Sequence, residues 1–328
     1  MKLSEVFRAY KEGTFPGTES LSETARVSEF AGFLQKGLRT ELFNSYQNWI
    51  GPVDFMFKRV PSSLFTEVWP KLSAPDLPAE RLMSGEFVRL GFNSEIVNLT
   101  NREYGAIMEI DRFLIDTDQT RMINAIPGKM GEAMGRQDHL LAYTFMNNGL
   151  TATCYDAVLI FALTAAAHPN VTGGAAVAAN ANYTVLGALS EANYETALVT
   201  IQGWRGIFDE LINPKVTGII TGTTDQFTAQ RIFKDSTRMS TAAGLDYGHN
   251  RNIHYNEVEV QFDKALTAAS WYLKTDITGF VNQELTPLEL MKETDESGLS
   301  FDTRVYRYRV YRAGVLGCVD WRGFYKGN

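Results

Sequence analysis

The sequence predicts a mixed α+β fold in which extended segments project from a packed body. Apolar residues recur every three or four positions in segments 26–46 and 118–149, which is typical of amphipathic helices. Apolar and basic residues alternate in segment 304–312, which is typical of a strand with two unlike faces. Between these, residues 150–290 change repeatedly from helix-like to strand-like patterns, as chains that mix both kinds of element do.

The composition is that of a globular protein that needs neither a metal nor a disulfide to fold. The chain has 328 residues, of which 45% are hydrophobic and 21% are charged, so a sizeable core can form. Its 38 acidic residues outnumber its 31 basic residues, which gives a net charge of −7. Proteins that grip nucleic acid by its phosphates normally have a basic excess. If this protein meets DNA, we expect it to enclose the DNA without sequence-specific contact.

The sequence gives no sign of export or of membrane insertion. Charged residues interrupt the first 15 positions, which argues against a signal peptide. The longest nearly apolar run, 157–167, is too short for a bilayer, which needs about 20 residues. We therefore expect a protein that is made in the cytoplasm and has no membrane partner. Cys154 and Cys318 are interpreted as two reduced, buried thiols, and a disulfide between them stays an open alternative.

Two segments in the first third of the chain look unstable by themselves. The first predicted helix has little local core, so we expect residues 1–50 to form an arm that docks on another copy. Half of the ten prolines lie between residues 52 and 78, which disfavours helix up to about residue 79. Strand-like runs at 85–92 and 96–110 then predict a long hairpin. Isolated hairpins are marginal in water, so we expect this one to pack on a partner too.

A long helix is predicted for 118–149, with Asn147, Asn148 and Gly149 as its stop signal. Pro127–Gly128 is expected to kink or divide it. One stripe of this helix is expected to face the core: Met130, Met134, Leu141 and Phe145. Further along, the sequence predicts a surface loop at 173–182, a helix from Ser190 to Gly203, a strand at 216–221, a helix at 223–233, and strands at 257–262 and 268–273.

The predicted strand at 304–312 has an apolar face, with Tyr306, Tyr308 and Val310, and a basic face, with Arg307 and Arg309. The basic face either contacts DNA or forms ion pairs with acids of the same or a neighbouring subunit. We favour ion pairs, because arginine suits interfaces and acids outnumber bases in this chain. Acids close in sequence are candidate partners: Glu289, Glu293, Asp295, Glu296 and Asp302.

The search for an active site, a cofactor site or a metal centre finds none in the sequence. Residues 128–135 superficially resemble a phosphate loop, but Met130 follows the lysine where Ser or Thr is required, so close helix packing explains these glycines better. Asp116 and Asp118 lack the further ligands of a calcium loop and are interpreted as helix-capping acids. Cys154 with a distant histidine is too common a combination to predict a nucleophile. We therefore predict a protein without catalysis.

Four stretches resemble one family of proteins. They are Pro61–Val68, Tyr104–Asp118, Asn148–Asp156 followed by Ala167–Pro169, and the tail with Trp271–Leu273 and Asp320–Arg322. On these stretches the chain resembles the major capsid proteins of tailed bacteriophages with the Hong Kong (HK-type) phage fold, and most closely the Mu-like major head subunit family. The resemblance covers roughly residues 60–328.

The resemblance implies a division of the chain into parts. It places an N-terminal arm at 1–50, an extended loop with flanking strands at 51–112, the spine helix of a peripheral domain at 113–150, an axial domain at 151–290, and strands that return to the peripheral domain at 291–328. Subunit contacts are then expected at the apolar face of the arm, at the predicted hairpin and at the basic face of the strand at 304–312. The candidate interface residues are Phe30, Phe33, Leu34, Phe87, Phe92, Arg307 and Arg309.

The function implied is that of a major head protein that self-assembles into the icosahedral shell of a tailed bacteriophage. Its implied partners are further copies of itself, in hexamers and pentamers, together with scaffolding, portal and decoration proteins and the packaged double-stranded DNA. Its implied location is the virion capsid, assembled in the host cytoplasm. Three alternatives stay open: the shell of an encapsulin-like nanocompartment, a tail-tube or connector subunit, and a soluble enzyme.

Overall fold

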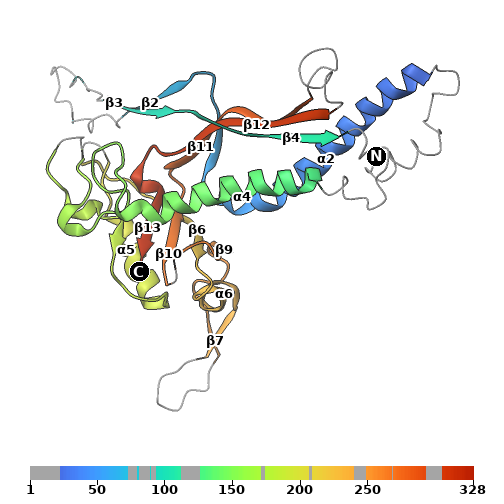
Figure 1. Cartoon of the computed structure of the whole chain (residues 1–328). Coiled ribbons are helices and arrows are strands. Elements are labelled where there is room, and N and C mark those ends of the chain that lie inside the picture. The colour runs from blue at the N-terminus through green and yellow to red at the C-terminus, as the bar shows by residue number, and fades with distance from the viewer. Residues whose placement is uncertain are drawn as a thin grey trace.

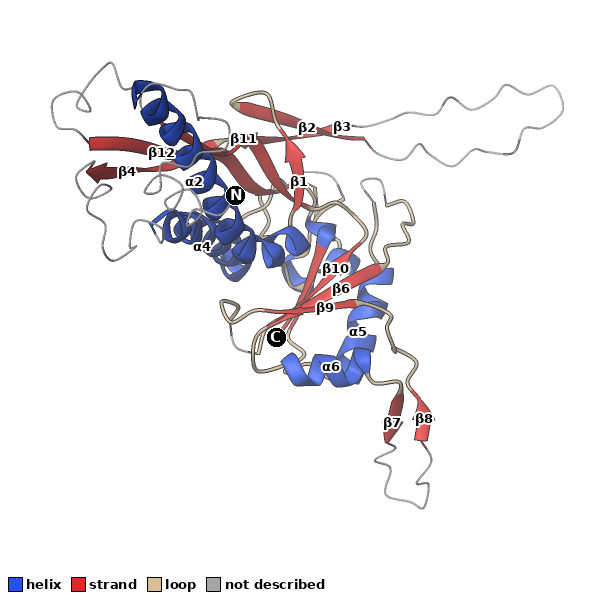
Figure 2. Cartoon of the chain, turned by 90° about the vertical axis from the view of Figure 1, so that its right-hand side faces the viewer, coloured by secondary structure: helices blue, strands red, loops and turns tan. Residues whose placement is uncertain are grey.

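The computed structural model builds the chain from two long helices, two sheets and two projecting hairpins (Figure 1). It describes residues 23–72, 80, 89, 94–111, 126–170, 174–206, 209–239, 249–267, 269–292 and 305–328. The four-stranded sheet lies alongside the long helices, and the five-stranded sheet lies beyond their other side, with the shorter helices (Figures 1 and 2). One continuous apolar core joins these elements.

Helix α2 (Glu23–Met56) is longer than the sequence predicts, and its C-terminal half belongs to the core. Pro52 lies inside the helix without ending it, so the expectation that no helix occurs after residue 50 is wrong for 51–56. The predicted end of the arm therefore falls within a helix. Burial of a full apolar stripe outweighs the local cost of proline, which is about 3 kcal/mol. The buried residues of this stripe are Leu42, Tyr46, Ile50, Val53 and Met56.

Helix α4 (Ile126–Asn147) crosses α2 at close range. Pro127 lies in its first turn, where a missing N–H costs nothing, so the expected kink does not occur in the described helix. A Cβ atom at Gly131 would collide with the backbone carbonyl of Leu42, and one at Gly135 would lie 2.8 Å from Cβ of Trp49. These glycines therefore permit the helix contact, which confirms their interpretation as packing residues.

The four-stranded sheet has the order β1-β11-β12-β4. Its central pair is antiparallel, β4 is antiparallel to β12, and β1 is parallel to β11. Tyr308 and Val310 of β12 are buried in the core, which confirms the apolar face that the sequence predicts. The strands are β1 (Lys58–Pro61), β4 (Arg102–Asp111), β11 (Phe280–Lys292) and β12 (Val305–Cys318).

The extended hairpin exists, but its strands are not the predicted pair. β2 (Thr66–Leu72) pairs with β3 (Ser94–Thr100), whereas the sequence predicts pairing between runs 85–92 and 96–110. The predicted second run is divided at Asn101, after which the chain enters β4 and the four-stranded sheet. The run at 85–92, apart from Arg89, lies outside the described residues. Figure 2 shows β2 and β3 projecting from the body.

The five-stranded sheet has the order β5-β13-β10-β6-β9, and helices α5 and α6 lie beside it (Figure 2). Helix α5 confirms its prediction: Ser190 caps it by accepting a hydrogen bond from the backbone N–H of Asn193 at 3.2 Å. Strand β6 also has the predicted bounds. The elements are β5 (Tyr183–Thr184), α5 (Glu191–Gln202), β6 (Val216–Thr221), α6 (Gln226–Lys234), β9 (Glu259–Phe262), β10 (Trp271–Thr275) and β13 (Phe324–Gly327). A short hairpin, β7 (Thr237–Met239) with β8 (His249–Arg251), projects beyond α6.

The segment predicted as a surface loop at 173–182 proves to be partly core. Asn180 and Asn182 have no exposed surface. The side chain of Asn182 accepts a hydrogen bond from the N–H of Ala162 at 2.7 Å and donates to the carbonyl of Ile160 at 2.7 Å. It also lies 3.2 Å from the carbonyl oxygen of Trp321. The low-complexity composition gave no hint of this, because the partners lie elsewhere in the chain.

Candidate subunit interface and the buried polar clusters behind it

A polar cluster fixes the base of the β2–β3 hairpin to the four-stranded sheet. The amide of Gln283 on β11 donates to the side-chain oxygen of Asn101 at 3.0 Å and accepts from the indole N–H of Trp69 at 3.0 Å. Asn101 in turn donates to Ser62 Oγ at 3.0 Å and to the carbonyl of Leu64 at 2.8 Å. Gln283 and Asn101 are buried, so each bond replaces water at a site where an unpaired polar atom costs about 1–3 kcal/mol.

The outer face of the hairpin is apolar and exposed, although its inner face is anchored. Side chains alternate along both strands, so Val68, Leu72 and Ile96 all point away from the body. Their exposed fractions are 51%, 67% and 63%, and Pro70 lies directly opposite Ile96. Phe65, at the start of the hairpin, is 70% exposed. Apolar residues occupy half of the outward positions of the two strands, and polar residues occupy the other half. Exposed apolar side chains grouped in this way are typical of a surface that another protein covers.

The basic face of β12 forms an ion pair, as predicted, but with a different acid. Arg307 lies 2.7 Å from Glu109, its partner across the sheet on β4. Strand β4 supplies the acid opposite Arg307. Of the acids predicted as partners, Glu289 lies opposite Tyr311, and the other four lie outside the described residues. Arg309 is exposed, with its guanidinium 5.8 Å from the ring centre of Tyr311. Of the two arginines, Arg309 therefore has the more open charge for a partner.

The other predicted interface residues are not placed in detail. Phe30, Phe33 and Leu34 belong to the first half of α2, and their side chains lie outside the described residues. Phe87 and Phe92 also lie outside the described residues. The acids at 116–118 and residue 304, where the basic strand was predicted to start, also lie outside the described residues. The structure therefore brings together only Arg307 and Arg309 from the predicted set.

A buried charge cluster joins α2, α4 and β12. Asp138 on α4 forms an ion pair with Arg312 and accepts a hydrogen bond from the hydroxyl of Tyr46 at 2.6 Å. Arg312 also donates to the side-chain oxygen of Asn282 at 3.0 Å. Asp138 and Arg312 are 2% and 3% exposed, and burial raises the pKa of Tyr46. This cluster fixes the crossing of the two helices on the sheet.

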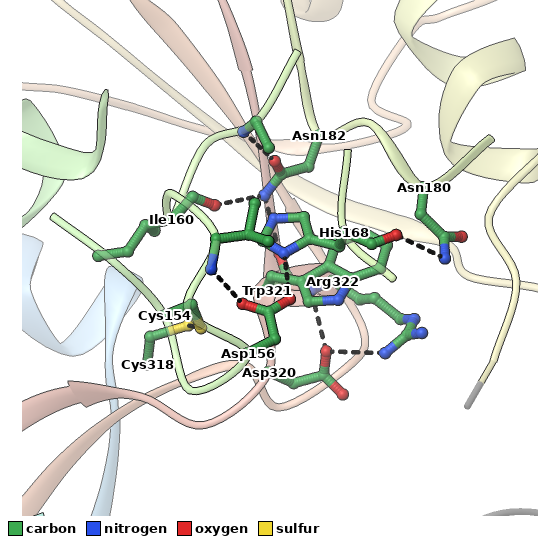
Figure 3. Close-up of polar contacts among 12 residues, drawn as sticks. Cys154, Asp156, Ile160, His168, Asn180, Asn182, Cys318, Asp320, Trp321 and Arg322 are labelled. Carbon is green, nitrogen blue, oxygen red and sulfur yellow. Dashed lines mark hydrogen bonds and ion pairs between the residues drawn. The ribbon is translucent and has the colours of Figure 1, made fainter. Parts of the chain in front are cut away.

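Residues from two of the four resembling stretches meet in a second buried cluster, shown in Figure 3. His168 lies 2.6 Å from the carboxylate of Asp156 and stacks on Trp321, with ring centres 4.4 Å apart. The guanidinium of Arg322 lies 4.3 Å from the centre of the Trp321 ring. Its N–H groups donate to the carbonyl of Arg205 at 2.7 and 2.9 Å. His168 has no exposed surface, so this cluster holds the loops together in the interior.

Asp320 joins this cluster to the hairpin through an ion pair with Lys71 at 3.0 Å. Burial alone would raise the pKa of Asp320. The charges of Lys71 and Arg322 outweigh burial and hold this pKa below its ordinary value. The folded protein therefore favours the ionised carboxylate more strongly than the unfolded chain does.

We expect this pair to make the subunit sensitive to acid. A lowered folded pKa gives stability that is present above the unfolded pKa, about 3.9, and is lost as pH falls through the folded pKa. Urea unfolding of wild type from pH 7 to about pH 3 should show this loss. In Lys71→Met the carboxylate gains less from folding, so its acid-dependent decline should be shallower. Lys58→Met, at an exposed position, is the control, and an identical decline in all three proteins would contradict the assignment.

Both cysteines are buried, as the sequence predicts. Cys154 and Cys318 are 8% and 7% exposed, and their sulfurs lie 2.6 Å apart (Figure 3). Burial, followed by the neighbouring thiol, raises the pKa of Cys318. A thiol that resists ionisation is a poor nucleophile, and this applies to Cys318.

One group of potential metal ligands occurs among the described residues: Glu191, Glu195 and His254. Both nitrogens of His254 already face carboxylates, Glu257 at 2.8 Å and Glu195 at 3.3 Å. Glu195 is exposed, and no unpartnered buried ligand points into the group. The arrangement is therefore that of a histidine held between carboxylates, of which Glu195 belongs to α5. It does not identify a metal centre.

Sequence reasoning missed the residues that hold the fold together. Asp138 occupies the buried face of α4 between Gly135 and Ala142, and a charge in that position of an apolar stripe was a readable signal. Arg312 likewise falls on the buried face of β12. Gln283, Asn101 and Asn182 gave no signal, because their partners come from distant segments.

Comparison with known proteins places these features in a family. Residues 100–327 match a family model described as phage capsid protein. No curated protein matches the sequence significantly. Among the helices in the described part of the chain, neither long one has an apolar stretch that could cross a bilayer.

One solved capsid structure shares the fold at low sequence identity, and two further phage structures match with lower scores. A chain from the capsid of a native GTA particle matches with a TM-score of 0.50 and 12% identity, over 84% of this chain and 88% of that chain. A chain of Mycobacterium phage Patience matches with a TM-score of 0.49 and 10% identity, over 97% of this chain and 91% of that chain. A chain of the bacteriophage JBD30 capsid matches with 0.45 and 12%, over 83% of this chain and 62% of its own length.

The family model covers well over half of the chain, from the end of β3 through α4, the five-stranded sheet and three of the four strands of the other sheet. The mixed α+β fold of the HK type, predicted from the sequence, is confirmed. The chain belongs to the phage capsid protein family, and it is a structural protein of the virion capsid that assembles into heads, not an enzyme.

Proposed function

We propose that this chain is the repeating subunit of a closed icosahedral shell, and that the outer face of its β2–β3 hairpin lies on a neighbouring copy. The observation that carries the proposal is the contrast between the two faces of the hairpin. Its base is bound to the sheet through Gln283 and Asn101, while Val68, Leu72 and Ile96 are left open. A hairpin held at its base and apolar on its free face is suited to docking on a second subunit.

The edges of the sheets support the same proposal. In the described residues, β4 has one neighbour, β12, so its other edge offers unpaired backbone groups. Ile107 on this edge strand is 66% exposed. A symmetric assembly covers such edges repeatedly, because each subunit presents the same surfaces to its neighbours. Arg309 and the predicted residues Phe30, Phe33, Leu34, Phe87 and Phe92 complete the proposed interface.

The finer assignments are proposals that rest on the sequence. The resembling stretches support a place in the Mu-like major head subunit family. The two long helices with the four-stranded sheet are proposed as the peripheral domain, and the five-stranded sheet as the axial domain. Hexamers and pentamers of the chain, scaffolding, portal and decoration proteins, and enclosed double-stranded DNA are the proposed partners. The net charge of −7 supports enclosure of DNA without tight binding to it.

The proposed docking of the hairpin predicts a loss of assembly when its open face is charged. Val68→Asp and Ile96→Asp place carboxylates where a neighbour should bury the side chains. Losing the burial of one such side chain costs about 1.5–3 kcal/mol, which is about a tenfold or greater fall in the association constant per contact. We expect unassembled subunits in gel filtration and few closed shells in electron micrographs.

Asn98→Ser is the matched control, because Asn98 lies on the same face, opposite Val68, and the substitution keeps an uncharged polar side chain there. It should assemble nearly as well as wild type. Circular dichroism separates loss of assembly from loss of folding, because exposed positions should leave the subunit folded. Shell yields from both charged variants that equal the wild-type yield would show that this face meets no neighbour.

A further inference from the structure

We propose that Cys154 and Cys318 are a covalent cross-linking site, which closes to an intrachain disulfide when the protein meets an oxidising medium. Their sulfurs lie 2.6 Å apart. Non-bonded carbon atoms meet at about 3.5–4.0 Å, so two larger sulfur atoms at this separation are inside ordinary contact. A disulfide bond needs about 2.05 Å, so a small movement completes it.

Fixed backbone delivers both sulfurs to this position. Cys154 donates its backbone N–H to the carbonyl of Val158 at 2.7 Å, within the 151–170 segment. Cys318 is the last residue of β12 and lies opposite Phe280 on β11. The next residue, Val319, donates to the carbonyl of Gly279 at 2.7 Å. The approach of the two thiols is therefore a property of two anchored segments, and it does not depend on a mobile side chain.

The cross-link would connect two parts of the described structure. β12 belongs to the four-stranded sheet, and the 151–170 segment supplies Asp156 and His168 to the buried cluster beside Trp321 (Figure 3). The cysteines are separated by 164 positions, so the disulfide would close a long loop of the unfolded chain. Long loops gain the most from closure, because they lose the most conformational freedom in the unfolded state. The disulfide would thus lock the sheet to the loop.

The chemistry is a thiol–disulfide exchange with a small-molecule disulfide as the oxidant. One cysteine loses its proton and attacks a sulfur of the oxidant, which releases one small thiol and leaves a mixed disulfide. The second cysteine loses its proton and displaces the other small thiol. Two protein thiols become one disulfide, and the oxidant is reduced to two thiols. Because burial raises the pKa of Cys318, few thiolates form in the folded protein, and closure should be slow unless the site opens locally.

The medium decides when the site closes. The cytoplasm keeps thiols reduced, whereas the virion surface is one of the places where disulfides form and persist. A capsid protein passes from one setting to the other when the particle is released. We therefore expect open thiols during assembly and closed ones in released particles. This inference concerns contacts within one chain, so it stands or falls independently of the proposed hairpin interface.

The test is thiol counting on the full-length protein. Purified protein is incubated with oxidised glutathione, then unfolded in denaturant and treated with a maleimide reagent. We expect labelling to fall from two groups per chain to none, with faster migration in non-reducing electrophoresis. Added reductant should restore both labels and the original mobility. The oxidised wild type should also unfold at a higher urea concentration than the reduced wild type.

Cys154→Ala and Cys318→Ala are the matched controls. Each variant should show one label per chain, and its unfolding midpoint in urea should be the same with and without the oxidant. The wild-type label count and its migration decide together, so the test survives a variant that fails to fold. Lost labels without faster migration would mean that glutathione stays on both cysteines, and would overturn the proposal. Two labels per chain after oxidation would overturn the proposal, and so would disulfide-linked dimers, because they would show that the sulfurs pair between chains.

Discussion

Asp138→Asn is expected to lower the free energy of unfolding by about 3–5 kcal/mol, because it leaves a buried arginine without its counterion. Asp138 is the acid that faces Arg312, and it also accepts a hydrogen bond from the hydroxyl of Tyr46. Both charged side chains are almost completely buried. Urea unfolding of the unassembled subunit, followed by circular dichroism, measures the change.

The structural reason can be isolated by removing both charges together. The double variant Asp138→Leu with Arg312→Met should lose less stability than the sum of the losses in the two single variants. The reason is that each single variant leaves one buried charge without its partner, whereas the double variant leaves none. Glu132→Gln is the surface control: it breaks the exposed pair with Lys129, and such pairs contribute about 0–1 kcal/mol. Additive costs in the double variant would show that Asp138 and Arg312 act independently, against the cluster described here.

Trp321→Ala is expected to cost a similar amount, about 3–5 kcal/mol, through the cavity that it leaves. The ring has no exposed surface. It stacks on His168 and meets the ring of Trp204 edge-on, with centres 5.2 Å apart. Loss of this side chain therefore removes the common support of His168 and Arg322. The unfolding midpoint in urea and the shell yield should both fall.

Trp321→Phe should cost less than Trp321→Ala, because an aromatic ring still fills much of the space. Tyr255→Ala is the control for removing an aromatic side chain, since Tyr255 is 52% exposed and should change stability by about 0.5 kcal/mol or less. Equal stability of Trp321→Ala and wild type would mean that the cluster in Figure 3 contributes little to the fold.

Local patterns identified most elements and part of the candidate interface. The period of apolar residues located α5, β6 and the two-faced strand β12. Turn and capping residues located the C-terminal end of α4 and both ends of α5. Arg307 was predicted to form an ion pair and does so. These predictions succeeded because period, capping and strand alternation depend on residues that are near one another in the chain.

Predictions failed where the outcome depended on distant segments. Residues 94–100 pair with 66–72, and Asn101 is bound by Ser62 and Gln283, so the hairpin begins earlier in the chain than its strand-like runs suggest. Pro52 was expected to exclude helix, but the contact of α2 with α4 overrides this local preference. The free energy gained by burying one helix against another can exceed the local cost of a proline, and the local sequence pattern does not show this gain.

The sequence by itself determined the class of this protein: a mixed fold with an acidic surface, no catalytic motif, and stretches that resemble capsid proteins. Only the tertiary structure decided which strands pair, which charges are buried together, and that Cys154 meets Cys318. The physical reason is that a short segment encodes which of its faces is apolar. What covers that face is decided by contacts between residues far apart in the chain, including the neighbouring copies proposed for the hairpin.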